Sequence, residues 1–228
     1  MNTVLQINVV CGTGSTGRIV TGIDKLIDKS KYHSYIAYGY GDSDLKNSIK
    51  IETKTGYYIH NFLSRCTGLQ GNFSINSTKK FLKKLNKISP NIIHLHNIHG
   101  NFINYKILFK YIKEKDIKVV WTLHDTWAIT GKCTNYENCD KWKNQCYKCD
   151  KLKQYPSSIL DNTKREYINK KYIFNLVKPL IITPSIWLET AVKQSYLKDC
   201  KIQVINNGID LKKFKSVYSC EIRKKYNI

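Results

Sequence analysis

Short apolar runs alternate with segments of helical periodicity along most of the chain. The apolar runs predict buried strands at residues 3–11, 34–38, 91–96, 117–124, 180–183 and 202–205. Apolar residues at helical spacing predict helices near residues 19–27, 59–69, 79–88, 103–112 and 186–196. Strands that alternate with helices indicate a parallel sheet covered on both faces. We therefore predict an α/β fold, a doubly wound and mostly parallel sheet of the Rossmann-like kind.

One long segment, residues 126–158, departs from this pattern. It shows little periodicity, and a loop of this length is either functional or held by something. It contains four cysteines, Cys133, Cys139, Cys146 and Cys149, and the last two form a C-x2-C pair that is typical of half a tetrahedral zinc site. We predict a structural zinc ion bound by these four thiolates and no organic cofactor. Free or redox-active thiols, or two disulfides in an oxidising compartment, are the alternatives.

Composition adds a strong basic bias. The chain has 228 residues, with 38 Lys and Arg against 17 Asp and Glu. Such a surface attracts phosphate, nucleic acid or an anionic membrane, although a lysine-rich genome would give the same bias. The lysines are scattered and the chain has no recognised nucleic-acid motif, so we expect no nucleic-acid partner. An anionic membrane surface is the partner that the charge favours.

Two observations bear on the compartment. No run approaches the ~18 apolar residues of a membrane-spanning helix. The first strand begins at the N-terminus without a basic region before it, which argues against a secretory signal. We expect a cytoplasmic protein, peripheral on the inner face of the membrane if it binds lipid.

A glycine-rich turn follows the first strand. Gly12, Gly14 and Gly17 form a G-x-G-x-x-G pattern directly before a predicted helix, and Arg18 follows. Glycines let a phosphate approach the backbone, and the helix N-terminus offers free N–H groups. A dinucleotide site would need an acid at the end of the second strand, where Asp42 is the first candidate. A general anion-binding turn, or simply tight packing of helix on strand, are the other interpretations.

Histidines mark the ends of two neighbouring predicted strands. His94 and His96 alternate onto the same face of one strand, and Asn97 and His99 follow it. His124 ends the next strand beside Asp125, which can orient an imidazole and raise its basicity. Ligands bind at the carboxyl edge of open α/β sheets, so these residues predict a cleft. Histidines that only pack or hydrogen-bond are the alternative.

Three segments together resemble the N-terminal domain of the retaining, GT-B fold glycosyltransferases of family 4, in the branch that assembles colanic acid and other exopolysaccharides. The first is Gly-Ser-Thr-Gly-Arg at residues 14–18. The second runs from residue 94 through His-Asp-Thr-Trp at residues 124–127 and the cysteines to residue 156. The third is Pro-Ser-Ile-Trp-Leu at residues 184–188 with Asn-Gly-Ile-Asp at residues 207–210.

The resemblance implies a role for each group of residues. The catalytic pair would be His124 and Asp125, with His124 beside the transferred sugar. The donor phosphates would be bound by Gly12, Gly14, Gly17 and Arg18. The acceptor would be bound by His94, His96, Asn97 and His99. A nucleotide-sugar would be the co-substrate and a saccharide or lipid-linked molecule the acceptor, with the anomeric configuration retained.

The resemblance also implies a domain division. Residues 1–210 would form the acceptor-side domain, with a Cys-rich insertion at about 126–158. Residues 211–228 would be the start of a donor-binding domain. We expect this chain by itself to lack donor affinity and turnover. A non-catalytic half that binds an acceptor or a partner chain with the donor domain is the alternative function, and a zinc-stabilised basic module for nucleic acid is a remote one.

Overall fold

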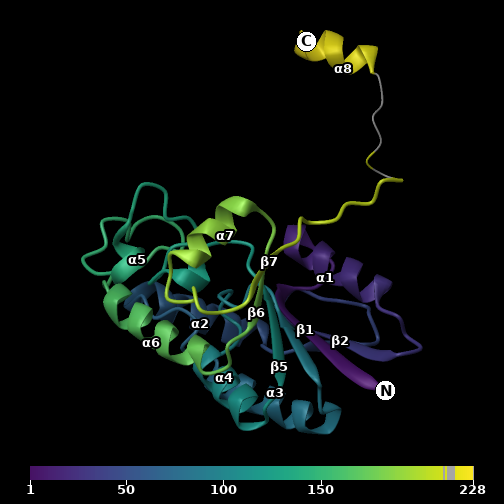
Figure 1. The fold of residues 1–228 in the computed structure, drawn as a ribbon, viewed down its shortest axis with the longest axis horizontal. Coiled ribbons are helices and arrows are strands. Elements are labelled where there is room, and N and C mark those ends of the chain that lie inside the picture. The colour runs from purple at the N-terminus through teal and green to yellow at the C-terminus, as the bar shows by residue number, and fades with distance from the viewer. Residues whose placement is uncertain (213, 215–218, 228) are drawn as a thin grey trace.

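The computed structural model describes residues 1–212, 214 and 219–227 (Figure 1). Its strands are β1 Asn2–Val10, β2 Tyr32–Tyr40, β3 Ser48–Lys50, β4 Ile92–Leu95, β5 Lys118–Thr122, β6 Leu180–Thr183 and β7 Ile202–Val204. The longer helices are α1 Gly14–Leu26, α2 Lys54–Thr67, α3 Ile75–Ile88, α4 Tyr105–Glu114, α6 Thr163–Asn175 and α7 Ile186–Lys193. Three short helices complete the described chain: η1 Trp127–Ile129, α5 Lys141–Asn144 and α8 Cys220–Tyr226.

In the described part of the chain, the strands form one parallel sheet in the order β3-β2-β1-β4-β5-β6-β7. Its register is continuous across the centre, where Ile7 is opposite Leu95, Leu95 opposite Trp121, and Trp121 opposite Ile181. The carboxyl ends of the central strands therefore meet at one edge, where ligands bind in folds of this class. The predicted doubly wound α/β fold is confirmed.

The two faces of the sheet bury different kinds of side chain. Leu5 and Ile7 of β1 point into the main core, which also contains apolar residues of α3, α4, α6 and α7. Gln6 lies between them in sequence and faces α1, where its side-chain amide donates to the carbonyl of Val20 at 3.1 Å. A small second cluster lies on that side. Figure 1 shows α1 above β1 and β2, and α4 and α6 to the left of the strands.

Sequence patterns missed β3 and α6. β3 has three residues, too few for a periodic signal. The reason for α6 is chemical, because its buried side includes Glu166 and Lys170 as well as Tyr167, Ile173 and Phe174. Buried charges interrupt the apolar stripe by which an amphipathic helix is recognised. The loop predicted at residues 126–158 contains only η1 and α5 as regular structure.

The predicted division into 1–210 and 211–228 stays a prediction. Residues 213, 215–218 and 228 of the second part lie outside the described residues. The part that is described includes α8, which Ser219 caps by accepting from the N–H of Ile222. Across the described residues, no helix combines the length and the apolar character that crossing a membrane requires.

Candidate functional site at the carboxyl edge of the sheet

Three histidines from β4 and β5 lie in contact at the carboxyl edge. The ring centroids of His94 and His96 are 4.2 Å apart, which confirms that alternation places them on one face. His96 Nδ1 lies 3.1 Å from His124 Nε2, with the two rings stacked. His94 Nε2 lies 2.8 Å from Thr122 Oγ1. The parallel register thus brings together side chains from two strand ends that are 28 residues apart.

A second pair joins the two loops that follow these strands. His99 Nε2 lies 2.8 Å from Asp125 Oδ2, and the other carboxylate oxygen accepts from the N–H of Trp127 at 2.8 Å. Burial raises the pKa of Asp125, but His99 and the Trp127 N–H together outweigh that effect and hold the pKa below its usual value. Asp125 is therefore a carboxylate, and it orients the His99 ring.

Burial favours the neutral form of the histidines that are in contact. It lowers the pKa of His94 to about 4, with a further contribution from His124. The pKa values of His96 and His124 are also lowered, chiefly by burial. A neutral imidazole has one N–H donor and one acceptor nitrogen, so the cluster can offer both kinds of hydrogen bond to a ligand.

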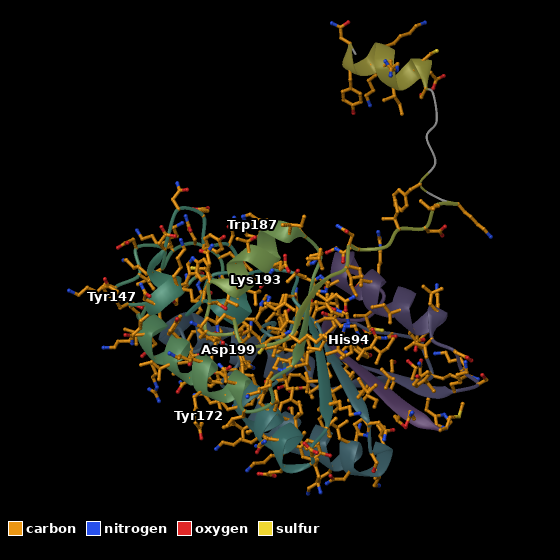
Figure 2. All side chains as sticks on the ribbon, in the orientation of Figure 1. His94, Tyr147, Tyr172, Trp187, Lys193 and Asp199 are labelled. Carbon is orange, nitrogen blue, oxygen red and sulfur yellow. The ribbon has the colours of Figure 1, made fainter. Side chains whose placement is uncertain are left out.

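A cavity lies at this edge, and most of the predicted site residues line it. Its lining includes His96, Asn97, His99, His124 and Asp125. His96 Nε2 is buried there without a hydrogen-bond partner among the described residues, so one polar atom of the lining is left unsatisfied. His94 does not line this cavity; it lies within β4, two residues before His96, and Figure 2 labels it among the strands. The structure thus groups four of the predicted acceptor and catalytic positions around Asp125.

The glycine-rich turn is linked to this site through Asn8. The Asn8 amide nitrogen donates to Thr16 Oγ1 at 3.2 Å, and its amide oxygen accepts from the N–H of Asn97 at 3.2 Å. One β1 side chain therefore holds the first turn of α1 beside the end of β4. The strand pattern gave no functional signal for Asn8, but a buried amide near a strand end is a feature that could have been noted.

The turn has the backbone that its glycines permit. Gly12 and Gly14 have φ of +72° and +64°, a conformation that other residues rarely adopt. A Cβ at Gly17 would lie 3.0 Å from Val10 Cγ2 and 3.2 Å from the Gly12 nitrogen. No side chain caps α1, and its first turn has no acidic residue, so its N–H groups are available to an anion.

Lys170 was not predicted as a site residue, yet it holds residues 127–131, which directly follow the site, by hydrogen bonds to their backbone. It is fully buried, and its ammonium group donates to the carbonyls of Trp127 and Thr130 at 3.0 and 3.2 Å and to that of Gly131 at 3.5 Å. The ammonium also lies 3.5 Å from the centroid of the Trp127 ring. Burial lowers the pKa of Lys170 to about 8, against the attraction of Glu166. The lysine fixes the backbone directly after Asp125.

The four cysteines of the predicted zinc site, Cys133, Cys139, Cys146 and Cys149, line one further cavity. Cys133 and Cys149 hydrogen-bond to each other, and Cys146 Sγ accepts from the N–H of Gly131 at 3.1 Å. Over the residues that the structure describes, no three or more His, Cys, Asp or Glu side chains form a group that could hold a metal. In this arrangement the four thiols are not drawn together into a closed metal site, so zinc stays a prediction from the cysteine spacing and the proposed function does not depend on it.

Known proteins resemble this chain along most of its length. A sequence profile described as Glycosyltransferase Family 4 matches residues 33–213. The colanic acid biosynthesis glycosyl transferase WcaC of Escherichia coli K12 is 25% identical, in a match that covers 91% of this chain and 55% of WcaC. This chain therefore spans about half the length of that relative.

Solved structures support the same fold. The crystal structure of a glycosyltransferase from Rickettsia africae ESF-5 superimposes with a TM-score of 0.51 at 14% identity. That match covers 99% of this chain and 49% of the other. At this identity the likeness concerns the fold alone, but the profile matches well over half of the sequence. The chain belongs to Glycosyltransferase Family 4.

Proposed function

We propose that this chain supplies the acceptor-side half of a retaining glycosyltransferase. It would act at the inner face of the membrane in the synthesis of a bacterial surface polysaccharide. The sugar would move from a nucleotide-sugar to a saccharide or lipid-linked acceptor. Membership of the family supports transfer, and the relation to WcaC supports polysaccharide synthesis. The observation that carries the proposal is the cavity in which His96, His99, His124 and Asp125 meet beside the glycine-rich turn.

The acceptor is best placed in this cavity. His96 Nε2 is a buried polar atom without a partner among the described residues, and a sugar hydroxyl would satisfy it. His124 lies next to it and can donate or accept from its other ring nitrogen. Asp125 holds His99 in a fixed orientation at the same lining. These contacts would position one hydroxyl group rather than attack the sugar themselves.

The donor diphosphate would lie against the turn at Gly12 and Gly14. Backbone N–H groups at the start of α1 would bind its oxygens, and Arg18 adds a positive charge in the first turns. Asn8 joins this turn to the β4 end, which supports the placement of both substrates side by side.

In the front-side mechanism that we propose, the bond between the sugar C1 and the donor phosphate oxygen breaks. The acceptor oxygen bonds to C1 on the same face, and its proton passes to the leaving phosphate oxygen. No protein nucleophile is needed, because the acceptor oxygen itself attacks C1 and the leaving phosphate takes its proton. The chain would contribute by holding the reactants and by stabilising the developing charge.

Calorimetry on this chain tests the proposal first. UDP, GDP and their sugars are titrated separately, followed by an assay of nucleotide release with a bacterial lipid extract as acceptor. We expect this chain alone to show neither micromolar nucleotide binding nor turnover. With a chain that carries the donor-binding domain we expect both, with binding that Gly17→Ala weakens and turnover that His124→Ala abolishes. Micromolar nucleotide binding and turnover by this chain alone would contradict its assignment as one half. Saccharide binding without turnover, even with the donor-binding domain present, would support the non-catalytic alternative. Turnover that survives His124→Ala would remove His124 from the site.

A further inference from the structure

Helix α2 has its polarity reversed relative to an ordinary surface helix. Its buried residues are His60 and Ser64, and His60 Nδ1 lies 2.7 Å from Ser74 Oγ. Tyr58, Ile59 and Phe62 are instead 51–66% exposed. A helix on a soluble surface normally directs its apolar side chains inward and its polar ones outward. The exposed side of α2 therefore suits an apolar environment rather than water.

A second apolar segment, residues 155–160, is fixed against the C-terminal end of this helix. The N–H groups of Ile159 and Leu160 donate to the carbonyls of Arg65 and Cys66 at 2.8 and 3.2 Å. Gly68, with φ +73°, ends α2, and a Cβ there would lie 2.7 Å from the Leu160 carbonyl oxygen. The last carbonyls of the helix are thus satisfied by the segment itself, so the two pieces form one surface.

This segment is as exposed as the helix. Tyr155, Ile159 and Leu160 are 57–73% exposed. With Tyr58, Ile59 and Phe62 they make six large apolar side chains on two joined elements, which we call the apolar rim. Exposed apolar residues are ordinary when they occur singly, whereas a cluster of them marks a binding surface.

The apolar rim borders the candidate acceptor site. Asn61 of α2 accepts from the side-chain amide of Asn101 at 3.3 Å, two residues beyond His99. Most of the Tyr155 side chain is exposed, but partial desolvation raises the pKa of its hydroxyl. The negative charge of Asp125 adds to the rise, which indicates that the two residues are close. A molecule with its polar end in the cavity could therefore leave its apolar part along the rim.

The exposed charges on the two elements of the rim are of one sign. Residues 54–67 and 153–160 contain Lys54, Arg65 and Lys153, all exposed, and no Asp or Glu. The acids that flank these ranges in sequence are Glu52 and Asp161. Glu52 is buried and accepts from the N–H of Thr53, and Asp161 accepts from the N–H groups of Cys149 and Thr163. Aromatic and aliphatic side chains flanked by basic ones are the composition that binds the headgroup region of an anionic bilayer.

We propose that the apolar rim docks this chain on an anionic lipid bilayer and turns the mouth of the His124 cavity toward the membrane. The docking rests on the proposed function in one respect, because it selects a lipid-linked acceptor rather than a free saccharide. The apolar side chains would enter the headgroup boundary while Lys54, Arg65 and Lys153 contact the lipid phosphates. No change in the fold is required, since both elements are already held in place.

Vesicle co-sedimentation of the whole chain tests the docking. Vesicles of phosphatidylcholine with about a third phosphatidylglycerol are compared with pure phosphatidylcholine. We expect binding to the anionic vesicles only, and a loss of about tenfold or more in Ile59→Ser/Phe62→Ser, because two exposed apolar side chains no longer enter the lipid. The matched control is Ile168→Ser/Tyr172→Ser on α6, whose residues are equally exposed; Figure 2 shows Tyr172 on the outer side of that helix.

Three results would overturn the docking: equal loss in both double variants, unchanged binding in the rim variant, or equal binding to uncharged vesicles. A concentration-dependent dimer that Ile59→Ser/Phe62→Ser abolishes would assign the rim to a second copy instead. The vesicle assay contains no nucleotide and no acceptor. Failure of sugar transfer therefore leaves its outcome intact, and failure of docking leaves the nucleotide titration intact.

Discussion

His99 Nε2 and Asp125 Oδ2 are 2.8 Å apart, and this contact joins the loop after β4 to the loop after β5. Neither loop has regular structure at that point, so the pair and the Asp125–Trp127 turn fix their separation. The contact is partly buried, where a carboxylate and an imidazole interact more strongly than they do in water.

Asp125→Asn tests the pair. The amide keeps the shape of the carboxylate but offers His99 a weaker acceptor, so we expect a loss of about 1–3 kcal/mol in the free energy of unfolding. Urea denaturation measures it. Asp150→Asn provides a control, because Asp150 is exposed and its ion pair with Lys141 should contribute less than about 1 kcal/mol. Equal effects at the two positions would contradict the assigned contact.

The buried histidines predict that the fold loses stability as pH falls. In the folded chain the pKa of His94 is about 4 and that of His60 about 3, both below the value of about 6.5 in an unfolded chain. Below pH 6.5 the unfolded state therefore binds more protons, and stability falls until the folded pKa is passed. At pH 5 each such histidine costs about 2 kcal/mol.

Urea midpoints between pH 7.5 and pH 5 would show this loss, within the transition range of about 6.5 to 4. His60→Gln should reduce the slope, because one titrating group is removed from an otherwise unchanged interior. His33→Gln, at an exposed position, is the control for a histidine substitution that changes no buried group. A flat profile for the parent chain would show that the histidines are not buried in the neutral form.

Lys170 should be among the most sensitive positions in the chain. Lys170→Met removes the donor from the carbonyls of Trp127 and Thr130 and leaves Glu166 buried without the cation whose charge most favours its ionised form. We expect a loss of about 3 kcal/mol or more, measured by urea denaturation. The adjacent Lys171→Met changes an exposed side chain and should stay within about 0.5 kcal/mol. Similar values for the two variants would refute the role of Lys170.

Two glycines of α1 should respond in opposite directions to alanine. Gly17→Ala places a Cβ 3.0 Å from Val10 Cγ2 and close to the turn backbone, so we expect a loss of about 1–3 kcal/mol and weaker nucleotide binding. Gly22→Ala meets nothing within 4 Å and should stabilise the helix by about 0.5–1 kcal/mol. Thermal melts would measure the two stabilities, and calorimetry with the donor-binding domain present would measure the nucleotide affinity. Unchanged nucleotide affinity in Gly17→Ala would show that the turn does not bind the donor.

The cysteine spacing predicts about one zinc per chain in protein purified without added metal. Elemental analysis measures the content, and thiol titration before and after a chelator counts the cysteines that the metal protects. Cys139→Ser should abolish the metal content, whereas Cys200→Ser, at a buried position outside the cluster, should preserve it. A metal-free, folded chain would leave Cys133 and Cys149 as a hydrogen-bonded thiol pair.

Sequence patterns predicted the parts of the molecule that depend on apolar repetition. β4 and β5 were recognised because Ile93 and Val119 belong to continuous apolar runs, and their histidine ends could be assigned to one edge from the parallel order alone. α6 was missed because Lys170 and Glu166 are buried within it. No periodicity reveals that a lysine will be enclosed by carbonyls from a segment 40 residues away, since tertiary contacts decide it. Likewise, the exposure of the apolar side chains of α2 could be recognised only in the packed structure.

Two lysines, Lys132 and Lys170, each hold one end of the segment at residues 126–158 by hydrogen bonds to backbone carbonyls. The Lys132 ammonium donates to the carbonyls of Lys151, Leu152 and Gln154 at 2.8 to 3.2 Å, as Lys170 does to its own three carbonyls. Each ammonium group has three N–H groups and three carbonyl acceptors, so its hydrogen bonds are satisfied without a carboxylate. The segment is thus tied at both ends by bonds that oxidants and chelators do not break. The shape of this loop would therefore persist when its thiols are oxidised or a bound metal is withdrawn.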